Sequence, residues 1–100
     1  MDVRLGIEAT MASKFVLLYY PDPSAMEKAQ LHFPAHRARL DAFHSRGQLL
    51  HVGPFADRNR GAMGIFTSLE ACEEFMREDP FLLHGVVARH EVLEWNDMFD

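Results

Sequence analysis

The sequence predicts an α+β domain of the ferredoxin-like βαββαβ type, in which a four-stranded antiparallel sheet carries two helices on one face. Strand-like and helix-like segments follow one another in the order β-α-β-β-α-β along 100 residues, the length of one domain. Hydrophobic residues make up 48% of the chain and charged residues 25%, the balance of an ordinary globular protein. This composition argues against a disordered chain, and the sequence contains no internal repeat.

The first predicted strand runs from Lys14 to Tyr20, where aromatic and β-branched residues are concentrated. The Pro21-Asp22-Pro23 segment ends it. Apolar side chains occur at both odd and even positions, whereas a strand with one wet face would alternate. We therefore expect this strand to be covered on both faces.

Two signals describe the first helical region. Ser24 and Glu27 have the spacing of a capping box, which predicts a short helix after the first strand. Pro34 is expected to interrupt that helix, because proline removes a backbone donor and clashes with the preceding turn. The main helix is then predicted to begin at Pro34 and to end at Gly47, a residue suited to the left-handed cap.

His36, Leu40 and Phe43 are spaced four and three residues apart, so they share one face of this helix. Leu40 and Phe43 are large and apolar and must face the core. His36 is therefore predicted to point inward, from the first turn of the helix.

The second half of the chain supplies a hairpin, a helix and a last strand. Leu49–Phe55 and Gly61–Thr67 read as two strands around a polar turn. A helix capped by Thr67 or Ser68 follows, and Asp79-Pro80 ends it. One further turn from Phe81 to His84 and a last strand over Val86–Trp95 complete the domain.

The domain is predicted to span residues 14–95, with a flexible extension at 1–13 and a tail at 96–100. The net charge of −5 argues against a nucleic-acid binder, which would show a basic stripe. The sequence also shows no apolar run long enough for a membrane span and no signal peptide. Cys72 is the single cysteine, so no internal disulfide can form, which fits a reducing cytoplasm.

Two helices cover only one face of a four-stranded sheet. Because the first strand is apolar on both faces, a second copy of the chain is the economical cover for the open face. We therefore expect a homodimer that packs sheet against sheet.

His36 and Asp79 are the candidate catalytic pair. The positive end of the helix dipole would disfavour a second proton on an imidazole in the first turn, which leaves a neutral ring suited to general acid–base chemistry. Asp79 follows the second helix and could reach His36 if the two helices lie side by side, orienting the ring and stabilising an imidazolium. The alternative is a core histidine bonded to main chain and an Asp-Pro turn that only ends a helix.

Several short motifs in this order resemble the YCII-related domain family, over about Lys14 to Trp95. They are Phe33-Pro34-Ala35-His36-Arg37-Ala38-Arg39-Leu40, Gly47-x-Leu49-Leu50, Gly53-Pro54, Ser68-Leu69-Glu70-Ala71 and Asp79-Pro80-Phe81. The resemblance implies a dimeric α/β-barrel of ferredoxin-like subunits, and a histidine–aspartate active-site dyad at His36 and Asp79. Some relatives resemble dehydrochlorinases or muconolactone-isomerase-like enzymes acting on small rings derived from aromatics.

The resulting hypothesis is a small enzyme without cofactor or metal, a lyase or isomerase, that moves a proton on a small, partly apolar substrate. The alternative hypothesis is a non-catalytic ligand-binding or accessory dimer with a structural His–Asp pair. Substrate contacts are predicted from a strand end and from two aromatic walls. These residues are Tyr19, Gly53, Pro54, Phe55 and Phe81.

Other histidines give weaker signals. His32 and His36 have the i, i+4 spacing of two metal ligands on a helix, but Pro34 lies between them and no third ligand is evident. His51 and His90 fall within predicted strands and could meet across the sheet or lie at its edges.

Overall fold

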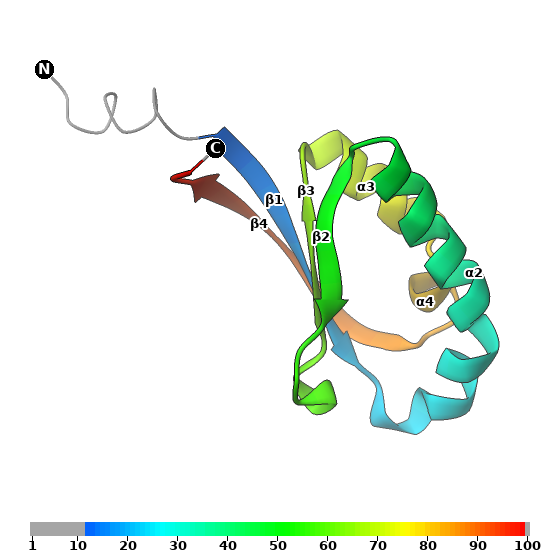
Figure 1. Cartoon of the computed structure of the whole chain (residues 1–100). Helices are drawn as coiled ribbons and strands as arrows, with labels where there is room; N and C mark the ends of the chain where they lie inside the picture. The colour runs from blue at the N-terminus through cyan, green and yellow to red at the C-terminus, as the bar shows by residue number, and fades with distance from the viewer. Residues whose placement is uncertain (1–11, 100) are drawn as a thin grey trace, which may run out of the picture.

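A computed structural model describes residues 12–99, and Figure 1 shows one sheet with all its helices on one side. The strand order is β2-β3-β1-β4 and every neighbouring pair is antiparallel. The strands are β1 (Ala12–Pro21), β2 (Leu49–Pro54), β3 (Ala62–Phe66) and β4 (Val87–Asp97). The helices are α2 (Met26–Ser45), α3 (Leu69–Arg77) and α4 (Pro80–Leu83), with 3₁₀ turns η1 (Pro23–Ala25) and η2 (Arg58–Arg60). The predicted βαββαβ α+β fold is confirmed.

The domain limits differ slightly from the prediction. Residues 1–11 of the predicted extension lie outside the described residues, whereas Ala12 and Ser13 already belong to β1 and pair with β4. At the other end, β4 continues through Asn96 to Asp97.

The core lies between the sheet and the helices. Phe43 of α2, Phe66 of β3 and Phe75 of α3 pack edge to face or tilted, with ring centroids 5.4 to 6.5 Å apart. Such arrangements suit the ring quadrupoles and add to the free energy gained by burying the rings. The core also contains Leu17, Tyr19, Leu49, Ala71 and Cys72.

Helix α2 corrects the prediction at Pro34. The helix runs unbroken from Met26 to Ser45 with Pro34 inside it, so neither a short first helix nor a start at Pro34 is found. Pro34 denies the carbonyl of Gln30 its usual donor. Both residues are exposed, so water can satisfy that carbonyl. Tertiary packing of the inward face, through His36 and Phe43, then holds the helix together.

The ends of the helices show which capping signals were correct. Ser68 caps α3 by accepting a bond from the Ala71 amide at 3.1 Å, one of the two predicted alternatives. Gly47 follows α2 with a φ of 75°, the predicted left-handed position. The capping box at Ser24 does not form; Asp22 caps η1 instead, through the Ser24 amide.

Gly61 is the glycine that the packing requires. Its φ is 94°, and a Cβ there would lie 1.8 Å from the carbonyl oxygen of Tyr19. Only glycine permits this close approach of the β2–β3 connection to β1.

The second face of the sheet carries no helix of residues 12–99 (Figure 1). Cross-strand register places Val16 opposite Ile65 and Leu93, and Leu18 opposite Met63, all on this face. Leu93 is 48% exposed. The predicted apolar second face is therefore present.

No helix within residues 12–99 is both long and apolar enough to cross a membrane. His51 lies on β2 and His90 on β4, which are the two outer strands, so these histidines do not meet across the sheet.

Candidate active site

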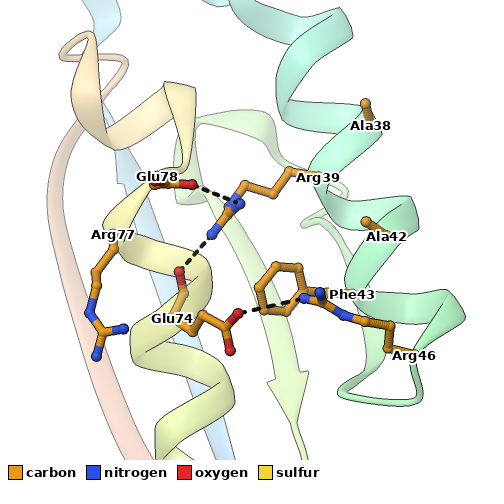
Figure 2. Close-up of a pocket in the computed structure, with 8 residues that line it drawn as sticks. All are labelled: Ala38, Arg39, Ala42, Phe43, Arg46, Glu74, Arg77 and Glu78. Atoms are coloured by element: carbon orange, nitrogen blue, oxygen red, sulfur yellow. Dashed lines mark hydrogen bonds and ion pairs between the residues drawn. The ribbon is translucent and has the colours of Figure 1, made fainter.

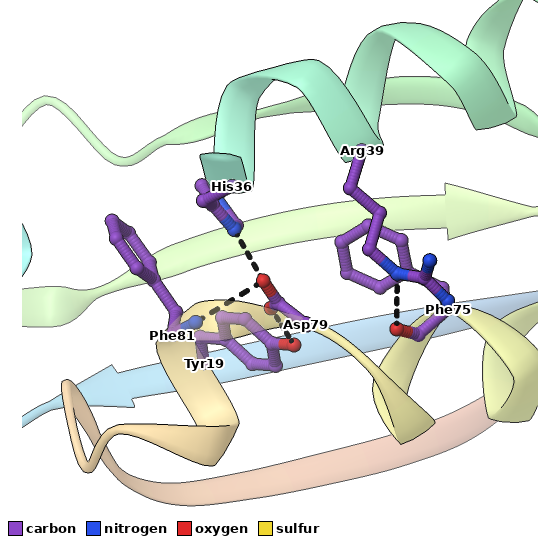
Figure 3. A network of polar contacts seen from close by, with 6 residues as sticks. All are labelled: Tyr19, His36, Arg39, Phe75, Asp79 and Phe81. Carbon is purple, nitrogen blue, oxygen red and sulfur yellow. Dashed lines mark hydrogen bonds and ion pairs between the residues drawn. The ribbon is translucent and has the colours of Figure 1, made fainter. Parts of the chain in front are cut away.

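His36 and Asp79 lie in contact, His36 on α2 and Asp79 at the junction of α3 and α4 (Figure 3). The distance from His36 Nδ1 to Asp79 Oδ1 is 2.6 Å. Asp79 is fully buried and His36 is 8% exposed. The structure thus brings the two predicted residues together in a nearly dry environment, where a charge-assisted hydrogen bond is strong.

Tyr19 is a third member of this network, and the sequence had suggested only a cavity wall for it. Its hydroxyl donates to Asp79 Oδ2 at 2.5 Å, and the Phe81 amide donates to Oδ1 at 3.2 Å. Burial, followed by the neighbouring Asp79, raises the pKa of Tyr19 far above its ordinary value. Tyr19 therefore remains a hydrogen-bond donor throughout the physiological range.

The tautomer of His36 is assigned from these contacts. If Asp79 is ionised, its carboxylate only accepts hydrogen bonds, so the nitrogen that faces it carries the proton. Nε2 makes no hydrogen bond within residues 12–99, and the neutral ring holds a free lone pair there. A nitrogen of this kind can take a proton from a bound molecule.

The ring is also fixed by aromatic packing. Phe81 stacks on His36 with centroids 3.8 Å apart and planes 6° apart, and Phe75 contacts it edge-on at 6.3 Å. The face of Phe81 would stabilise a positive charge formed on the imidazole.

The position of His36 differs from the prediction. Since α2 begins at Met26, His36 lies in the middle of the helix and not in its first turn. The field of the helix dipole is significant only within the terminal turns. The ring is therefore governed by Asp79 and Phe81, and the predicted effect of the helix N-terminus is wrong.

Asp79 owes its position to the break between two helices. Helix α3 ends at Arg77, and Asp79, with extended backbone (φ −72°, ψ 118°), caps α4 through the Phe81 amide. Pro80 is the first residue of α4, a place where proline is favoured. The Asp-Pro pair therefore both ends one helix and aims the carboxylate at α2.

Arg39 holds the end of α3 from α2. Its Nε donates to the Phe75 carbonyl at 2.9 Å and its Nη2 to the Glu74 carbonyl at 2.6 Å (Figures 2 and 3). These are carbonyls of the last turn, which lack helical donors. The guanidinium also lies over Phe43 and Phe75, at 4.9 and 5.6 Å. One side chain thus fixes the turn that precedes Asp79.

Figure 2 shows the cleft of about 590 Å³ that Arg39 crosses between α2 and α3. Arg46 stacks over Phe43 at 4.3 Å and lies 3.9 Å from Glu74, and Arg39 Nη1 lies 3.7 Å from Glu78. Arg39, Arg46, Glu74 and Glu78 thus bind across the cleft, so we interpret it as a contact between two helices and not as the candidate site.

A second groove, of about 790 Å³, opens beside His36 between α2 and the β2–β3 hairpin. His36 and three of the predicted contact residues line it, namely Gly53, Pro54 and Phe81. Tyr19 and Phe55 do not line it; Tyr19 lies behind Asp79, and Phe55 follows the end of β2. Sequence reasoning missed the rest of the wall. Those residues are Ala29, Gln30, Phe33, Arg37, Leu40, Asp41, His44, Leu50, His51, Val52, Arg58 and Ala62.

The missed residues carried a partial signal. Phe33, Arg37, Leu40 and His44 recur at helical spacing on the side of α2 next to the core stripe. A helix that starts at Pro34 does not include Ala29 and Gln30, whereas α2 starts at Met26 and carries both into the groove wall.

His32 does not join His36 in a metal site. The His32 ring stacks on His84 at 3.8 Å, while His36 stacks on Phe81. Within residues 12–99 no three histidine, cysteine or acidic side chains come together as metal ligands would.

Both the sequence and the fold of this chain are similar to those of known proteins. The profile of the YCII-related domain matches residues 13–96. The protein YciI of Escherichia coli O6:H1 is 32% identical over 96 residues, covering 85% of this chain and 98% of YciI.

Two solved structures share the fold. 5-Chloro-2-hydroxyhydroquinone dehydrochlorinase from Burkholderia phenoliruptrix, in complex with 2,5-dihydroxybenzoquinone, superposes with a TM-score of 0.68 at 22% identity, covering 82% of this chain and 92% of its own. A dimeric ferredoxin-like protein of unknown function from Bacteroides fragilis gives a TM-score of 0.53 at 9% identity, covering 85% and 95%.

Proposed function

The chain belongs to the YCII-related domain family, and from this premise we propose that it is a small enzyme that transfers a proton in an elimination or an isomerisation. His36 is the general acid–base and Asp79 orients it. The observation that carries the proposal is the 2.6 Å contact between His36 Nδ1 and a fully buried carboxylate, beside an open groove. No step of the proposed reaction requires a metal or a cofactor.

In the proposed elimination from a chlorinated hydroquinone ring, one hydroxyl proton first moves to the carbon that carries the chlorine, which gives a keto tautomer. Nε2 of His36 then takes the proton of a second hydroxyl, the electron pair of that O–H bond becomes a C=O π bond, the ring double bond shifts toward the chlorinated carbon, and chloride departs with the C–Cl bonding pair to leave a quinone. The imidazolium is stabilised by Asp79 and Phe81 and then releases its proton to solvent. In an isomerisation the same proton returns to another atom of the substrate.

The fold neighbour supports the elimination and the kind of substrate. Its name is that of a dehydrochlorinase, and its bound molecule is a flat quinone ring. In the present chain, the groove offers Phe81, Leu40 and Val52 as apolar walls next to His36, which suit a small, partly apolar ring. We propose such a ring as the substrate class.

The direct test is chloride release from 5-chloro-2-hydroxyhydroquinone. The wild type is expected to turn over, and His36→Gln to lose about 10²- to 10⁴-fold, the usual share of a general acid–base group. His44→Gln is the matched control, because His44 lines the same groove without contacting Asp79. Equal rates for His36→Gln and the wild type would refute the role of His36.

A second candidate is a non-catalytic ligand-binding or accessory dimer with a structural His–Asp pair. The complete burial of Asp79 and its bond to Tyr19 in the core favour it. Asp79→Asn separates the two: a folded variant with a lowered rate supports catalysis. If the wild type releases no chloride and Asp79→Asn is less stable than the wild type, the result supports a structural His–Asp pair.

The proposal includes a homodimer joined through the open sheet face, acting in the cytoplasm. The apolar second face and the dimeric fold neighbour support the dimer. The single cysteine, Cys72, is buried and suits a reducing compartment.

A further inference from the structure

We infer that the groove binds flat ligands that carry a negative charge, and that Arg58 binds the anionic group. This inference deepens the proposed function and rests on it for the location of the site. It concerns the class of ligand and not the proton transfer.

The charge of the groove is opposite to that of the chain. The chain carries a net charge of −5, yet Asp41 is the one acidic residue in the groove lining within residues 12–99. Asp41 is paired with Arg37 at 3.1 Å, which cancels both charges. Arg58 therefore remains as the charged residue of the lining that has no ion-pair partner among residues 12–99.

Arg58 is available for a ligand. It forms no ion pair with any of residues 12–99. The carboxylate of the preceding residue, Asp57, is used to cap η2 through the Asn59 amide at 3.0 Å. The Arg58 guanidinium can therefore donate hydrogen bonds from its planar fork to a carboxylate, phenolate or enolate.

The rest of the groove fits the body of such a ligand. His36 is held against Phe81, and Leu40 and Val52 add apolar surface on the two sides of the groove. Arg58 comes from the β2–β3 connection and His36 from α2, so a single ring molecule would meet the cation and the base from opposite walls. Binding through Arg58 would then orient the ring before proton transfer.

The test compares 4-hydroxybenzoate with 4-hydroxybenzamide, two rings of the same shape that differ in charge. Calorimetric titration of the wild type is expected to show tighter binding of the benzoate. Arg58→Gln should weaken benzoate binding about fivefold and leave benzamide binding unchanged, the magnitude of a partly exposed charge pair. Arg60→Gln is the matched control, because it removes the same charge from the same short turn outside the groove lining.

The inference is overturned if the wild type shows no preference for the benzoate up to about 10 mM, or if Arg60→Gln weakens binding as much as Arg58→Gln. The chloride-release assay reports separately on His36. Benzoate selectivity that depends on Arg58, without turnover, would leave this inference standing and remove the proposed reaction. Chloride release that depends on His36, without a preference for the benzoate, would support the proposed reaction and refute the inference about Arg58.

Discussion

At the scale of single residues, the buried carboxylate of Asp79 is the group that most needs hydrogen-bond donors from the fold. A charge removed from water costs several kcal/mol unless hydrogen bonds replace its hydration. Asp79 has three donors, from Tyr19, His36 and the Phe81 amide. Removing any one of them leaves the charge less well compensated.

Tyr19→Phe should therefore lower the free energy of unfolding by about 1–3 kcal/mol, because it deletes a buried donor to a charged group. Tyr20→Phe is the neighbouring control, since its hydroxyl donates to Glu91 on the more exposed side of the sheet at 2.8 Å. Urea denaturation measures both variants. If the two variants lose the same free energy of unfolding, the buried hydrogen bond of Tyr19 is no more stabilising than the exposed one of Tyr20.

Cys72 gives a prediction for alkaline pH. Burial raises the pKa of its thiol from 9.0 to about 11. Between these values the unfolded thiol has lost its proton and the folded thiol has kept it, so stability is fully present below pH 9 and falls as pH rises. The free energy of unfolding should drop by about 1 kcal/mol per pH unit in this window. Cys72→Ala should show a flatter dependence in urea titrations between pH 9 and 10, and an unchanged slope would contradict the shift.

The sequence predicted the pairing of His36 with Asp79 because helical spacing and the Asp-Pro break are local signals. The bond of Tyr19 could have been anticipated in part. Tyr19 shares its parity with Leu17 on the helix-facing side of β1, and a buried phenol needs a partner. Which acid it meets depends on how α3 and α4 join, and no local pattern encodes that junction.

At the scale of elements, Pro34 shows how packing can override a breaker. The chain tolerates proline inside α2 because His36 and Phe43 bury the turns that follow it, and His32 in the preceding turn stacks on His84. The stability of the whole domain offsets the cost of the missing hydrogen bond. The sequence rule that proline breaks a helix considers only the local loss of a hydrogen bond, and it therefore predicted that α2 would begin at Pro34.

Pro34→Ala should consequently stabilise the domain by about 1–3 kcal/mol, since it restores a helical donor without disturbing buried contacts. Ala35→Gly, at the next exposed position of the same turn, should do the opposite and cost about 1 kcal/mol. Thermal unfolding followed by circular dichroism compares them. A destabilised Pro34→Ala would mean that the proline ring itself shapes this turn.

Arg39 joins two elements and should be sensitive even to a conservative change. Arg39→Lys keeps the charge but cannot satisfy two carbonyls with a planar fork. We expect a loss of about 1–3 kcal/mol in the free energy of unfolding, with a shift of the His36 ring proton resonance as Asp79 moves. Arg37→Lys, whose partner Asp41 is solvent-exposed, should have little effect on either measurement. An unmoved ring resonance in Arg39→Lys would show that Arg39 does not position Asp79.

At the scale of the whole molecule, the two faces of the sheet differ in their cover. The helix side is packed with aromatic rings, whereas Leu93 and Trp95 on the other side remain 48% and 42% exposed. Sequence alone indicated this asymmetry, because it depends only on the parity of apolar residues in β1. The geometry of a partner does not follow from parity.

Leu93→Lys should shift the proposed dimer toward monomer, because it places a charge on the open face, midway along the outer strand β4. Leu83→Lys is the control, since Leu83 is 61% exposed on α4, on the helix side of the sheet. Light scattering coupled to size exclusion gives the masses. A wild type of about 11.5 kDa in solution would refute the dimer.

The outer ends of β1 and β4 have a topological consequence. Ala12 pairs with Asp97, so the fold begins and finishes at one place (Figure 1). The groove is built from α2, the α3–α4 junction and the β2–β3 hairpin, none of which includes those ends. A short peptide could therefore close the backbone into a ring, and a new opening at the Gly47 turn would give a circular permutant that keeps the site intact.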